Sequence, residues 1–545
     1  MLDGDNTIGP LVNASSYFGV GSKKNFALNA DHTFKCLIMD VSSKKNNNSR
    51  SPRLTDARLR SPPAEHMIDY VLMSKLRGEL EMFAQACQVD KAHTVMLAER
   101  DIIPRKDAAK ILSILKKISE LGADSFPVDP EAGSLLLQVE AYLFERIGEE
   151  VGGKMHTGRS RWDRGRSIWR LYARDRVLDI QRKLIELQEV VLKHSKEHVD
   201  TVMPGYTHLQ HAQPWTYGHY LTSFFYAFER DFKRLKQAYG NTNLNVLGTA
   251  AQAGTGWPVD RRRTTELLGF DGLVLNSRDV FREDYKVDIV SALAQILSDI
   301  NEIASDLLIW SSYEFRLVES SDAYAGSSSI MPQKKNPTAL ETVQQSTALG
   351  IGYCSSAFAG LRAGGTLRSG SVDTLAEALN TAEVTLALIA GILDTLIVHV
   401  DRMKELSGAF WSTASNLADV IVREAGISFR RAHHVVARLV RNAIEENIRP
   451  NEVSGGMVDR AAEETIGLSL KLHDDLISSA LDPVGFINSR VTEGSVNPKE
   501  VKKMLKDAGD KLETEKAWLK EQIEKISGAM SKLDYAIEAI INSRN

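Results

Sequence analysis

The sequence predicts an all-α fold built around a long central bundle of helices. Three observations support this prediction. Prolines are absent between Pro130 and Pro204, between Pro258 and Pro332, and between Pro337 and Pro450, so long uninterrupted helices are permitted there. Apolar residues recur in these windows at alternating steps of three and four. No run of alternating apolar and polar residues between turn signals competes with that pattern.

Two apolar stripes show the helical spacing most clearly. The first stripe consists of Val177, Ile180, Leu184, Leu187 and Val191. The second consists of Ile289, Leu293, Ile296, Ile300, Ile303 and Leu307. This spacing is typical of long helices that pack side by side with the stripe in the core. Both stripes are therefore expected to be scaffold rather than chemistry.

Composition changes along the chain predict a four-part organisation. Residues 1–60 are expected to be a disordered extension, because Ser42–Arg53 is basic and poor in apolar residues. The remaining expected parts are an N-terminal helical domain (61–158), a central bundle with the catalytic loop 326–337 (159–405) and a C-terminal helical domain (406–545). The charged, helical tail Asn497–Asn545 is expected to pack on the outside of that last domain.

The overall composition narrows the class of protein. With 67 basic and 71 acidic residues, the net charge of −4 gives no general attraction to nucleic acid, although the basic stretch near residue 50 keeps a nucleic-acid arm as the lesser alternative. Three scattered cysteines predict neither a disulfide framework nor a zinc site, and a reducing, cytoplasmic location is expected. No apolar run approaches the roughly 18 residues of a membrane span, and the first residues have no secretory or transit-peptide pattern. No cofactor or metal ion is expected.

The stretch Gly326–Glu341 carries the strongest sign of chemistry. It reads Gly-Ser-Ser-Ser-Ile-Met-Pro-Gln-Lys-Lys-Asn-Pro-Thr-Ala-Leu-Glu. Asn336 is a good N-cap residue and Pro337 suits the first helical position, so a helix is expected to begin there. Its free N–H groups and the charge of Lys334 would form a carboxylate pocket beside serine hydroxyls. The alternative is a capped glycine–serine loop without chemistry.

The same stretch resembles the signature of the aspartase/fumarase superfamily, Ser-Ser-x-Met-Pro-x-Lys-x-Asn. The form Met-Pro-Gln-Lys-Lys-Asn-Pro, preceded by Ser321–Tyr324, resembles the argininosuccinate lyase branch. The resemblance implies an enzyme that cleaves C–N or C–O bonds by β-elimination and releases fumarate. It also implies a three-domain fold in a homotetramer, with a twenty-helix core and active sites that each take residues from three chains.

Elimination of an amine from an N-substituted aspartate requires a base, stabilisation of a dianionic intermediate and an acid for the leaving nitrogen. By the resemblance, Ser328 is the expected base. Ser329 is the alternative, since Ser327 stands where the family has glycine. Lys334 and the helix start are expected to stabilise the Ser328 alkoxide. Three further residues of the loop are expected to contact substrate: Met331, Gln333 and Asn336.

A second segment, Met203–Pro214, resembles the family's Gly-Tyr-Thr-His-Leu-Gln motif. In that match Thr207 binds a substrate carboxylate and His208 serves as the catalytic acid. A metal pair formed by His208 and His211 is the alternative, but no further ligand lies at a telling spacing. His211 is therefore expected to be structural.

A third segment, Gly152–Asp163, resembles the family's His-Thr-Gly-Arg-Ser-Arg-Asn-Asp motif. Arginine binds carboxylates through two parallel hydrogen bonds. The resemblance makes Ser160 and Arg161 ligands of the fumarate part of the substrate. Arg159 and Arg164 are expected to be surface or interface charges.

Three departures from the family pattern concern substrate recognition. Trp162, which is expected to contact substrate, occupies the place of an asparagine, and Leu136 stands where argininosuccinate lyases carry a histidine. The segment Gly364–Asp373 lacks the family's tyrosine, glutamine and lysine. Losing polar partners changes the selectivity of a pocket strongly. The chemistry at the fumarate end is therefore expected to be kept while the amine differs.

The expected function is a fumarate-forming carbon–nitrogen lyase. Its substrate would be an N-substituted aspartate, or fumarate and an amine in the reverse direction. A true argininosuccinate lyase is the first alternative. A non-catalytic homologue, as lens crystallins of this family illustrate, is the second. The sequence leaves the amine, the direction and the pathway open.

Overall fold

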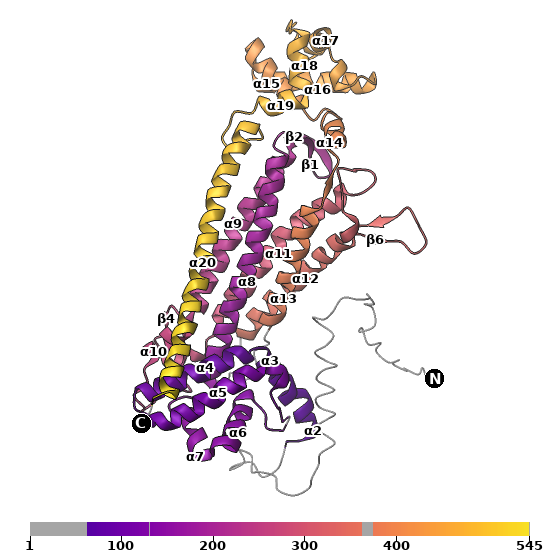
Figure 1. The fold of residues 1–545 in the computed structure, drawn as a ribbon. Coiled ribbons are helices and arrows are strands. Elements are labelled where there is room, and N and C mark those ends of the chain that lie inside the picture. The colour runs from indigo at the N-terminus through magenta and orange to yellow at the C-terminus, as the bar shows by residue number, and fades with distance from the viewer. Residues whose placement is uncertain (1–62, 130, 362–373, 544–545) are drawn as a thin grey trace, which may run out of the picture. The chain divides into compact units, whose positions relative to one another are not determined.

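Six long helices form the main body of the computed structural model, which describes residues 63–129, 131–361 and 374–543 (Figure 1). They are α8 (Arg161–Glu197), α9 (Tyr217–Thr242), α11 (Asp284–Trp310), α12 (Thr338–Leu361), α13 (Leu375–Asp394) and α20 (Pro498–Ile541). Contacts run in a closed ring from α8 to α9, α11, α12, α13 and back to α8. The predicted all-α fold with a long central bundle is confirmed. The expected extension 1–60 lies outside the described residues.

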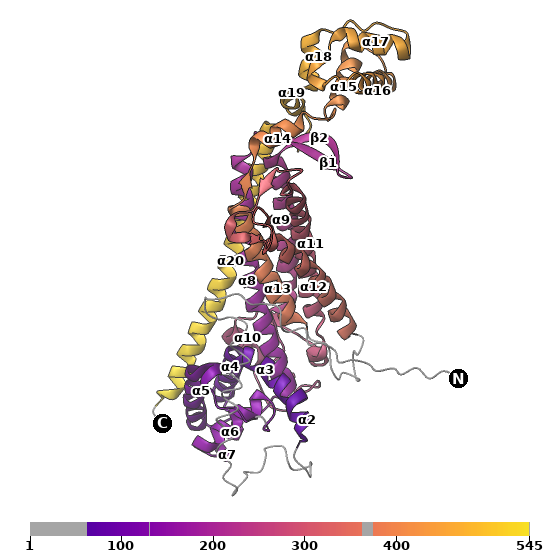
Figure 2. The ribbon, with the colours of Figure 1, turned by 90° about the vertical axis from the view of Figure 1, so that its right-hand side faces the viewer.

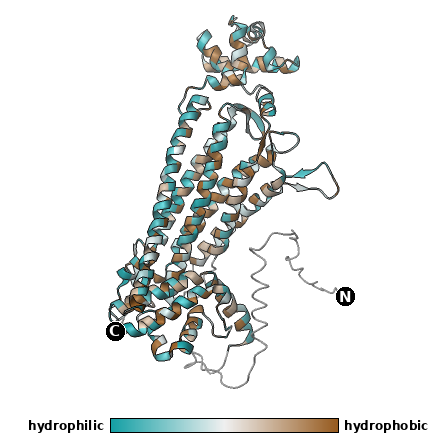
Figure 3. Cartoon of the chain, in the orientation of Figure 1, coloured by the Kyte–Doolittle hydropathy of each residue, from teal (hydrophilic) through white to brown (hydrophobic). Residues whose placement is uncertain are grey.

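The two apolar stripes expected from the sequence form the core of this bundle. All five stripe residues on α8 and all six on α11 are buried. In the first proline-free window α8 runs unbroken for 37 residues. The 3–4 spacing therefore identified both helices and the faces that they bury. Figure 3 shows apolar and polar residues interleaved along these helices.

The C-terminal tail does not pack where the sequence predicted. Helix α20 lies along α8 and α9 and reaches α4, α5 and α10, as the views of Figures 1 and 2 agree. The expected position on the outside of the C-terminal domain is wrong. The physical reason is an apolar stripe on α20 itself, in which Leu505, Leu512 and Leu519 recur every seven residues and are buried. On the facing side of α8, buried positions seven residues apart are polar: Ser167, Arg174, Gln181, Gln188 and Ser195.

Shorter helices surround the start of α8. They are α2 (Glu65–Met67), α3 (Met73–Glu81), α4 (Phe83–Glu99), α5 (Arg105–Ser125), α6 (Leu135–Ile147), α7 (Glu149–Gly152) and α10 (Arg261–Leu268). Helices α4 and α5 pack together, and α4 also contacts α8 and α10. The first turn of α8 is therefore held by helices that are distant from it in sequence.

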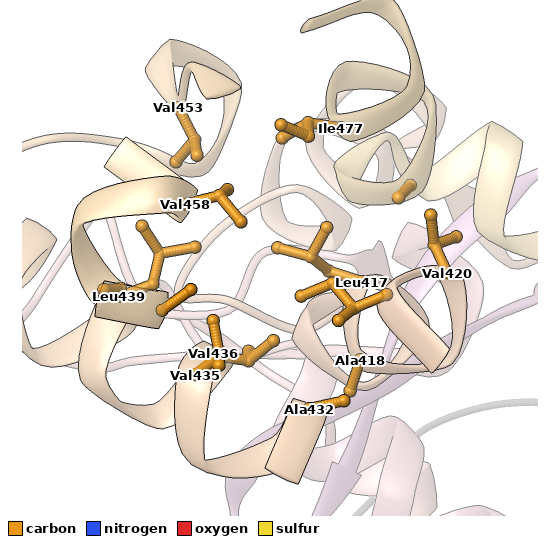
Figure 4. Packing of buried hydrophobic residues seen from close by; sticks show 14 of the residues in the cluster. Leu417, Ala418, Val420, Ala432, Val435, Val436, Leu439, Val453, Val458 and Ile477 are labelled. Carbon is orange, nitrogen blue, oxygen red and sulfur yellow. The ribbon is translucent and has the colours of Figure 1, made fainter. Parts of the chain in front are cut away.

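A separate apolar cluster lies among the helices that follow the bundle. These are α14 (Val400–Ser407), α15 (Ala414–Ala425), α16 (Phe429–Glu445), α17 (Gly455–Ile466), α18 (Asp474–Leu481) and α19 (Pro483–Asn488). Leu417, Val435, Leu439, Val458 and Ile477 are fully or almost fully buried in this cluster (Figure 4). The predicted domain boundaries after residues 60, 158 and 405 remain predictions.

Strands are few and short in the described residues, and all pair in twos. The pairs are β1–β2 (Val202–Thr207, Gln210–Thr216), β3–β4 (Leu244–Asn245, Gly272–Leu273), β5–β8 (Val318–Glu319, Ile397–Val398) and β6–β7 (Gly326–Ser327, Lys335–Asn336). The sequence pattern did not predict them. Two of these pairs, β1–β2 and β6–β7, are hairpins that carry predicted site residues.

The sequence analysis predicted no segment long and apolar enough to cross a membrane. By length and composition alone, helix α13 is such a segment. In the structure it packs against α8, α11 and α12, and buries residues such as Leu379, Leu386 and Ile389. These contacts are those of a bundle helix.

Candidate active site

Thr207 and His208 lie at the tip of the β1–β2 hairpin, which follows the end of α8. Thr207 pairs with Gln210, so His208 and Leu209 form a two-residue turn. Both have positive φ, 55° and 58°, as a type I′ turn requires. This conformation is unfavourable for a leucine, and such strain clusters at functional sites. All three side chains are exposed, so the hairpin presents its threonine and histidine outward.

His211 follows two residues after the turn and faces another way. Its ring packs edge-on against Tyr206 at 5.0 Å, and Tyr206 in turn contacts Phe315 at 5.3 Å. Burial lowers the pKa of His211. These contacts agree with a structural role.

The serine-rich loop projects between β6 and β7 as an exposed hairpin (Figure 1). The Ser328 hydroxyl oxygen accepts hydrogen bonds from the N–H groups of Met331 at 3.1 Å and Ile330 at 3.4 Å. Ser329, Met331, Gln333 and Lys334 are exposed. A side chain at Gly326 would meet the Thr338 hydroxyl at 2.4 Å, so a larger residue there would require Thr338 to shift.

Lys335 fixes the base of this loop. Its ammonium lies 2.8 Å from Glu319 and 2.7 Å from Asp322. Among the residues that the structure describes, Lys334 has no ion pair and stays the loop's available cation. Lys335 therefore anchors the loop, while the charge of Lys334 remains available.

Helix α12 begins one residue later than the sequence predicted. Its first residue is Thr338, and the Pro337 carbonyl accepts from Leu340 and Glu341. Pro337 thus precedes the first helical residue, and Asn336 lies in β7 rather than at the N-cap. Asn336 pairs with Gly326 across the hairpin instead. The free N–H groups of the helix start still lie directly after the loop.

Ser160 caps the start of α8. Its hydroxyl accepts from the Trp162 N–H at 3.0 Å, and its own N–H donates to the Asp163 carboxylate at 2.8 Å. Asp163 is buried and also accepts from Gly248 at 2.8 Å and Ala250 at 3.0 Å. Burial raises the pKa of the Asp163 carboxyl, and the N–H donors partly offset this effect. Arg161 therefore follows a rigidly held turn.

Arg159 and Arg164 are buried, so their expected place at a surface or interface is wrong. Both pair with Asp90 on α4: Arg159 at 2.7 Å, and Arg164 through two hydrogen bonds of 2.8 and 2.7 Å. Burial raises the pKa of the Asp90 carboxyl, but Arg164 and Arg159 outweigh this effect and lower it to about 2. The two arginines flank Ser160 and Arg161 in sequence, and Asp90 holds both ends of that segment.

Trp162 stands beside this turn and is 41% exposed. Its ring lies edge-on to Phe281 at 5.2 Å, and the Arg166 guanidinium lies 5.2 Å from its centre. Arg166 pairs with Glu283 at 2.5 Å. The indole thus contacts Phe281 and Arg166 while part of its surface stays exposed. Leu136, the other described departure, is buried in α6. The segment 364–373 lies outside the described residues.

The three predicted segments are not all brought together by one chain. Ser160 precedes α8 and the Thr207–His208 hairpin follows it, and a helix of 37 residues is about 55 Å long. The serine loop belongs to the hairpin's end of the bundle, because Phe315, just before β5, touches Tyr206. Among the described residues no hydrogen bond or ion pair joins the loop to the hairpin tip.

Comparison with known proteins agrees with these motifs. Residues 71–350 match a family model described as lyase, and residues 411–488 match one described as argininosuccinate lyase C-terminal. Argininosuccinate lyase from Methanococcus aeolicus is 36% identical over 87% of this chain and 96% of its own length. The chain belongs to the argininosuccinate lyase family. The predicted membership of the aspartase/fumarase superfamily is thereby confirmed.

Two solved structures extend the family likeness to three dimensions. EDDS lyase in complex with formate is 34% identical with a TM-score of 0.80, over 88% of this chain and 96% of that one. A double variant of EDDS lyase with bound fumarate is 33% identical with the same TM-score, over 88% of this chain and 97% of that one. Lyases with different names therefore share this fold.

Two residues that hold the site escaped the sequence reasoning. Asp163 had a local signal, because Ser160 followed three residues later by an acid is a capping box, the mark of a helix start. Asp90 had none, because it is 69 residues from Arg159 and 74 from Arg164. Only the packing of α4 on α8 makes it part of the site's frame.

Proposed function

We propose that this fumarate-forming carbon–nitrogen lyase of the argininosuccinate lyase family eliminates an amine from an N-substituted aspartate, with Ser328 as base. The observation that carries the assignment is at the Ser328 oxygen, which accepts two backbone N–H groups. Such donors stabilise an alkoxide, the form that a serine base requires. No comparable contact is found at Ser329, within the described residues, so the geometry favours Ser328.

The reaction has three steps on this assignment. The Ser328 alkoxide takes the proton from the carbon next to a substrate carboxylate, and negative charge spreads into that carboxylate. Lys334 and the free N–H groups after Pro337 stabilise this dianion. The C–N bond then breaks, His208 gives its proton to the leaving nitrogen, and fumarate is released. Ser160, Arg161, Thr207 and Asn336 hold the carboxylates, while Ser329, Met331 and Gln333 line the loop side of the site.

The active site is proposed to form between copies of the chain in a homotetramer. The length of α8 keeps Arg161 far from His208, so elimination needs a second copy that places its α8 start beside another chain's hairpin. Exposed apolar side chains on the bundle support such association. They are Leu349, Ile351 and Phe358 on α12 and Val384 on α13.

The amine is proposed to differ from that of argininosuccinate. Trp162 places an indole with one donor where the family has an amide with donors and acceptors. An amine with an apolar or flat part would pack on that ring. A true argininosuccinate lyase is the second candidate, favoured by the name of the relative from Methanococcus aeolicus.

A cytoplasmic location is also proposed. Cys87 and Cys354, the two cysteines that lie in the described part of the chain, are both free thiols. Unpaired thiols fit a reducing compartment.

Incubation with fumarate and a panel of amines, followed by the loss of fumarate absorbance, tests the function and the amine together. Arginine is included, as are amines with apolar and aromatic substituents. Consumption of fumarate with a non-arginine amine supports the proposal, and consumption with arginine alone selects the second candidate. If no amine is consumed and no N-substituted aspartate releases fumarate, the chain is a non-catalytic homologue.

A further inference from the structure

A cluster of metal-ligand side chains lies at the last turn of α8, apart from the residues assigned to elimination. His194, Glu197 and His198 each offer one ligand atom, and these atoms all lie within 4.8 Å of one another. Histidines four positions apart on a helix lie on one face, and a glutamate three positions after the first shares that face. The two imidazole rings are nearly parallel, at 14° and 6.5 Å between centres.

The contacts around His194 fit a coordinated imidazole. Its Nδ1 lies 3.2 Å from a Glu197 carboxylate oxygen, close to the roughly 3.4 Å that separates two ligands of a tetrahedral zinc ion. Its Nε2 is buried, makes no hydrogen bond within the described residues, and lies 4.0 Å from Asp394. A carboxylate behind a ligand histidine is the usual outer partner of a metal site.

The ring of His198 is also held by its neighbours, with one nitrogen left open. Its Nδ1 lies 3.0 Å from the Thr201 hydroxyl, which leaves Nε2 for coordination. The Tyr217 ring packs edge-on against the imidazole at 5.2 Å and limits its rotation.

The charges around this cluster favour the binding of a cation. The cluster stands at the C-terminal end of α8, where the helix dipole is negative. Glu197 adds a full negative charge. Lys193, which precedes His194 in sequence, is paired with Asp394 at 2.8 Å, which offsets its repulsion.

We propose that His194, Glu197 and His198 bind one divalent transition-metal ion of the zinc class, with water in the remaining position. Two imidazoles and one carboxylate are ligands that zinc, cobalt and nickel accept. The His198 carbonyl accepts from the N–H groups of Thr201 and Gly218, which close the base of the β1–β2 hairpin. The ion would therefore brace the hairpin that ends in His208. This inference is independent of the proposed lyase function.

Calorimetric titration of the full, EDTA-treated protein with Zn²⁺ tests the site. One ion per chain is expected, and the His194→Ala/His198→Ala double variant is expected to bind it at least tenfold more weakly. The matched control is His433→Ala/His434→Ala, which removes two exposed histidines from α16 that cannot share an ion on one helix face. Equal affinity in both double variants and the unchanged protein would overturn the proposal.

A second variant and a second readout guard against a folding defect. Glu197 is half exposed, so Glu197→Gln is expected to keep the fold while weakening Zn²⁺ binding. Co²⁺ in place of Zn²⁺ should give the visible absorption of a four-coordinate ion, lost in the His194→Ala/His198→Ala variant. Saturating Zn²⁺ should raise the Tm of the unchanged protein and of the His433→Ala/His434→Ala control. An unchanged Tm, or a Co²⁺ spectrum that survives removal of both ligand histidines, contradicts the site.

Discussion

The Asp90 carboxylate holds the Arg164 guanidinium through two hydrogen bonds, and both side chains are almost completely buried. Arg159, with its side chain fully buried, shares the same carboxylate. Its other two guanidinium nitrogens have no hydrogen-bond partner among the described residues. One acid on α4 thus pairs with both cations that flank the Ser160–Arg161 turn.

Asp90→Asn is expected to destabilise the protein by about 3–5 kcal/mol, because it leaves two buried guanidinium groups without a counter-charge. Urea unfolding at pH 7 measures the change. The matched control is Asp179→Asn, whose pair with Arg182 is exposed and should matter by less than about 1 kcal/mol. Because the pKa of Asp90 is about 2 in the fold, its contribution should be complete above pH ~4 and fall as pH drops toward 2. Equal midpoints for the two variants would show that Asp90 does not clamp the α8 start.

Glu515→Gln is expected to stabilise the protein at pH 7 to 8. Burial, together with the nearby Glu229, raises the pKa of the Glu515 carboxyl to about 8, although Gln188, Lys233 and Lys236 partly offset the rise. An unfolded glutamate has a pKa of about 4.3, so the folded state holds the proton between these values. The stability contribution is therefore full below pH ~4 and is lost as pH rises through 8. Thermal melts from pH 5 to 9 should show a shallower decline for the variant than for the exposed control Glu513→Gln, and parallel curves would contradict this account.

The apolar stripes on α8, α11 and α20 show what the sequence could and could not predict. The α8 and α11 stripes were readable because burial follows the 3–4 period within one helix. The partner of α20 was not, because an apolar seam on Leu505 and Leu512 does not say which helix covers it. Thr207 and His208 were found through a motif, but the turn that presents them was not, because a leucine in particular disfavours the left-handed backbone that His208 and Leu209 adopt. The role of Asp90 could not be predicted, because Arg159 and Arg164 are distant from it in the chain.

Trp162→Asn is expected to shift the choice of amine toward argininosuccinate. The change restores an amide next to Arg161 and removes the ring that packs edge-on against Phe281. The ratio of kcat/KM for argininosuccinate to that for the preferred substrate should rise by about tenfold or more. Tyr535→Asn, which removes an exposed aromatic ring from α20, should leave the ratio unchanged. A ratio that stays constant in both variants would remove Trp162 from substrate recognition.

Mixing two inactive variants should restore activity if sites are shared between chains. His208→Asn keeps a residue that tolerates positive φ while removing the acid, and Arg161→Ala, at the other end of α8, removes a proposed ligand of the substrate carboxylates. Coexpression places both chains in one oligomer, where sites that take the two segments from different variants are intact. Random assembly should recover about a quarter of the unmodified rate. Recovery no greater than the sum of the two separate variants would mean that one chain supplies both segments.

Fumarate release by Ser328→Ala, compared with Ser329→Ala and the unmodified protein on the best N-substituted aspartate, tests the central claim most directly. The account predicts that Ser328→Ala lowers kcat by roughly 10² to 10⁴, the size of a general-base contribution, while Ser329→Ala has a much smaller effect. Circular dichroism establishes that both variants fold. Unchanged fumarate release by a folded Ser328→Ala protein would contradict the assignment of the base.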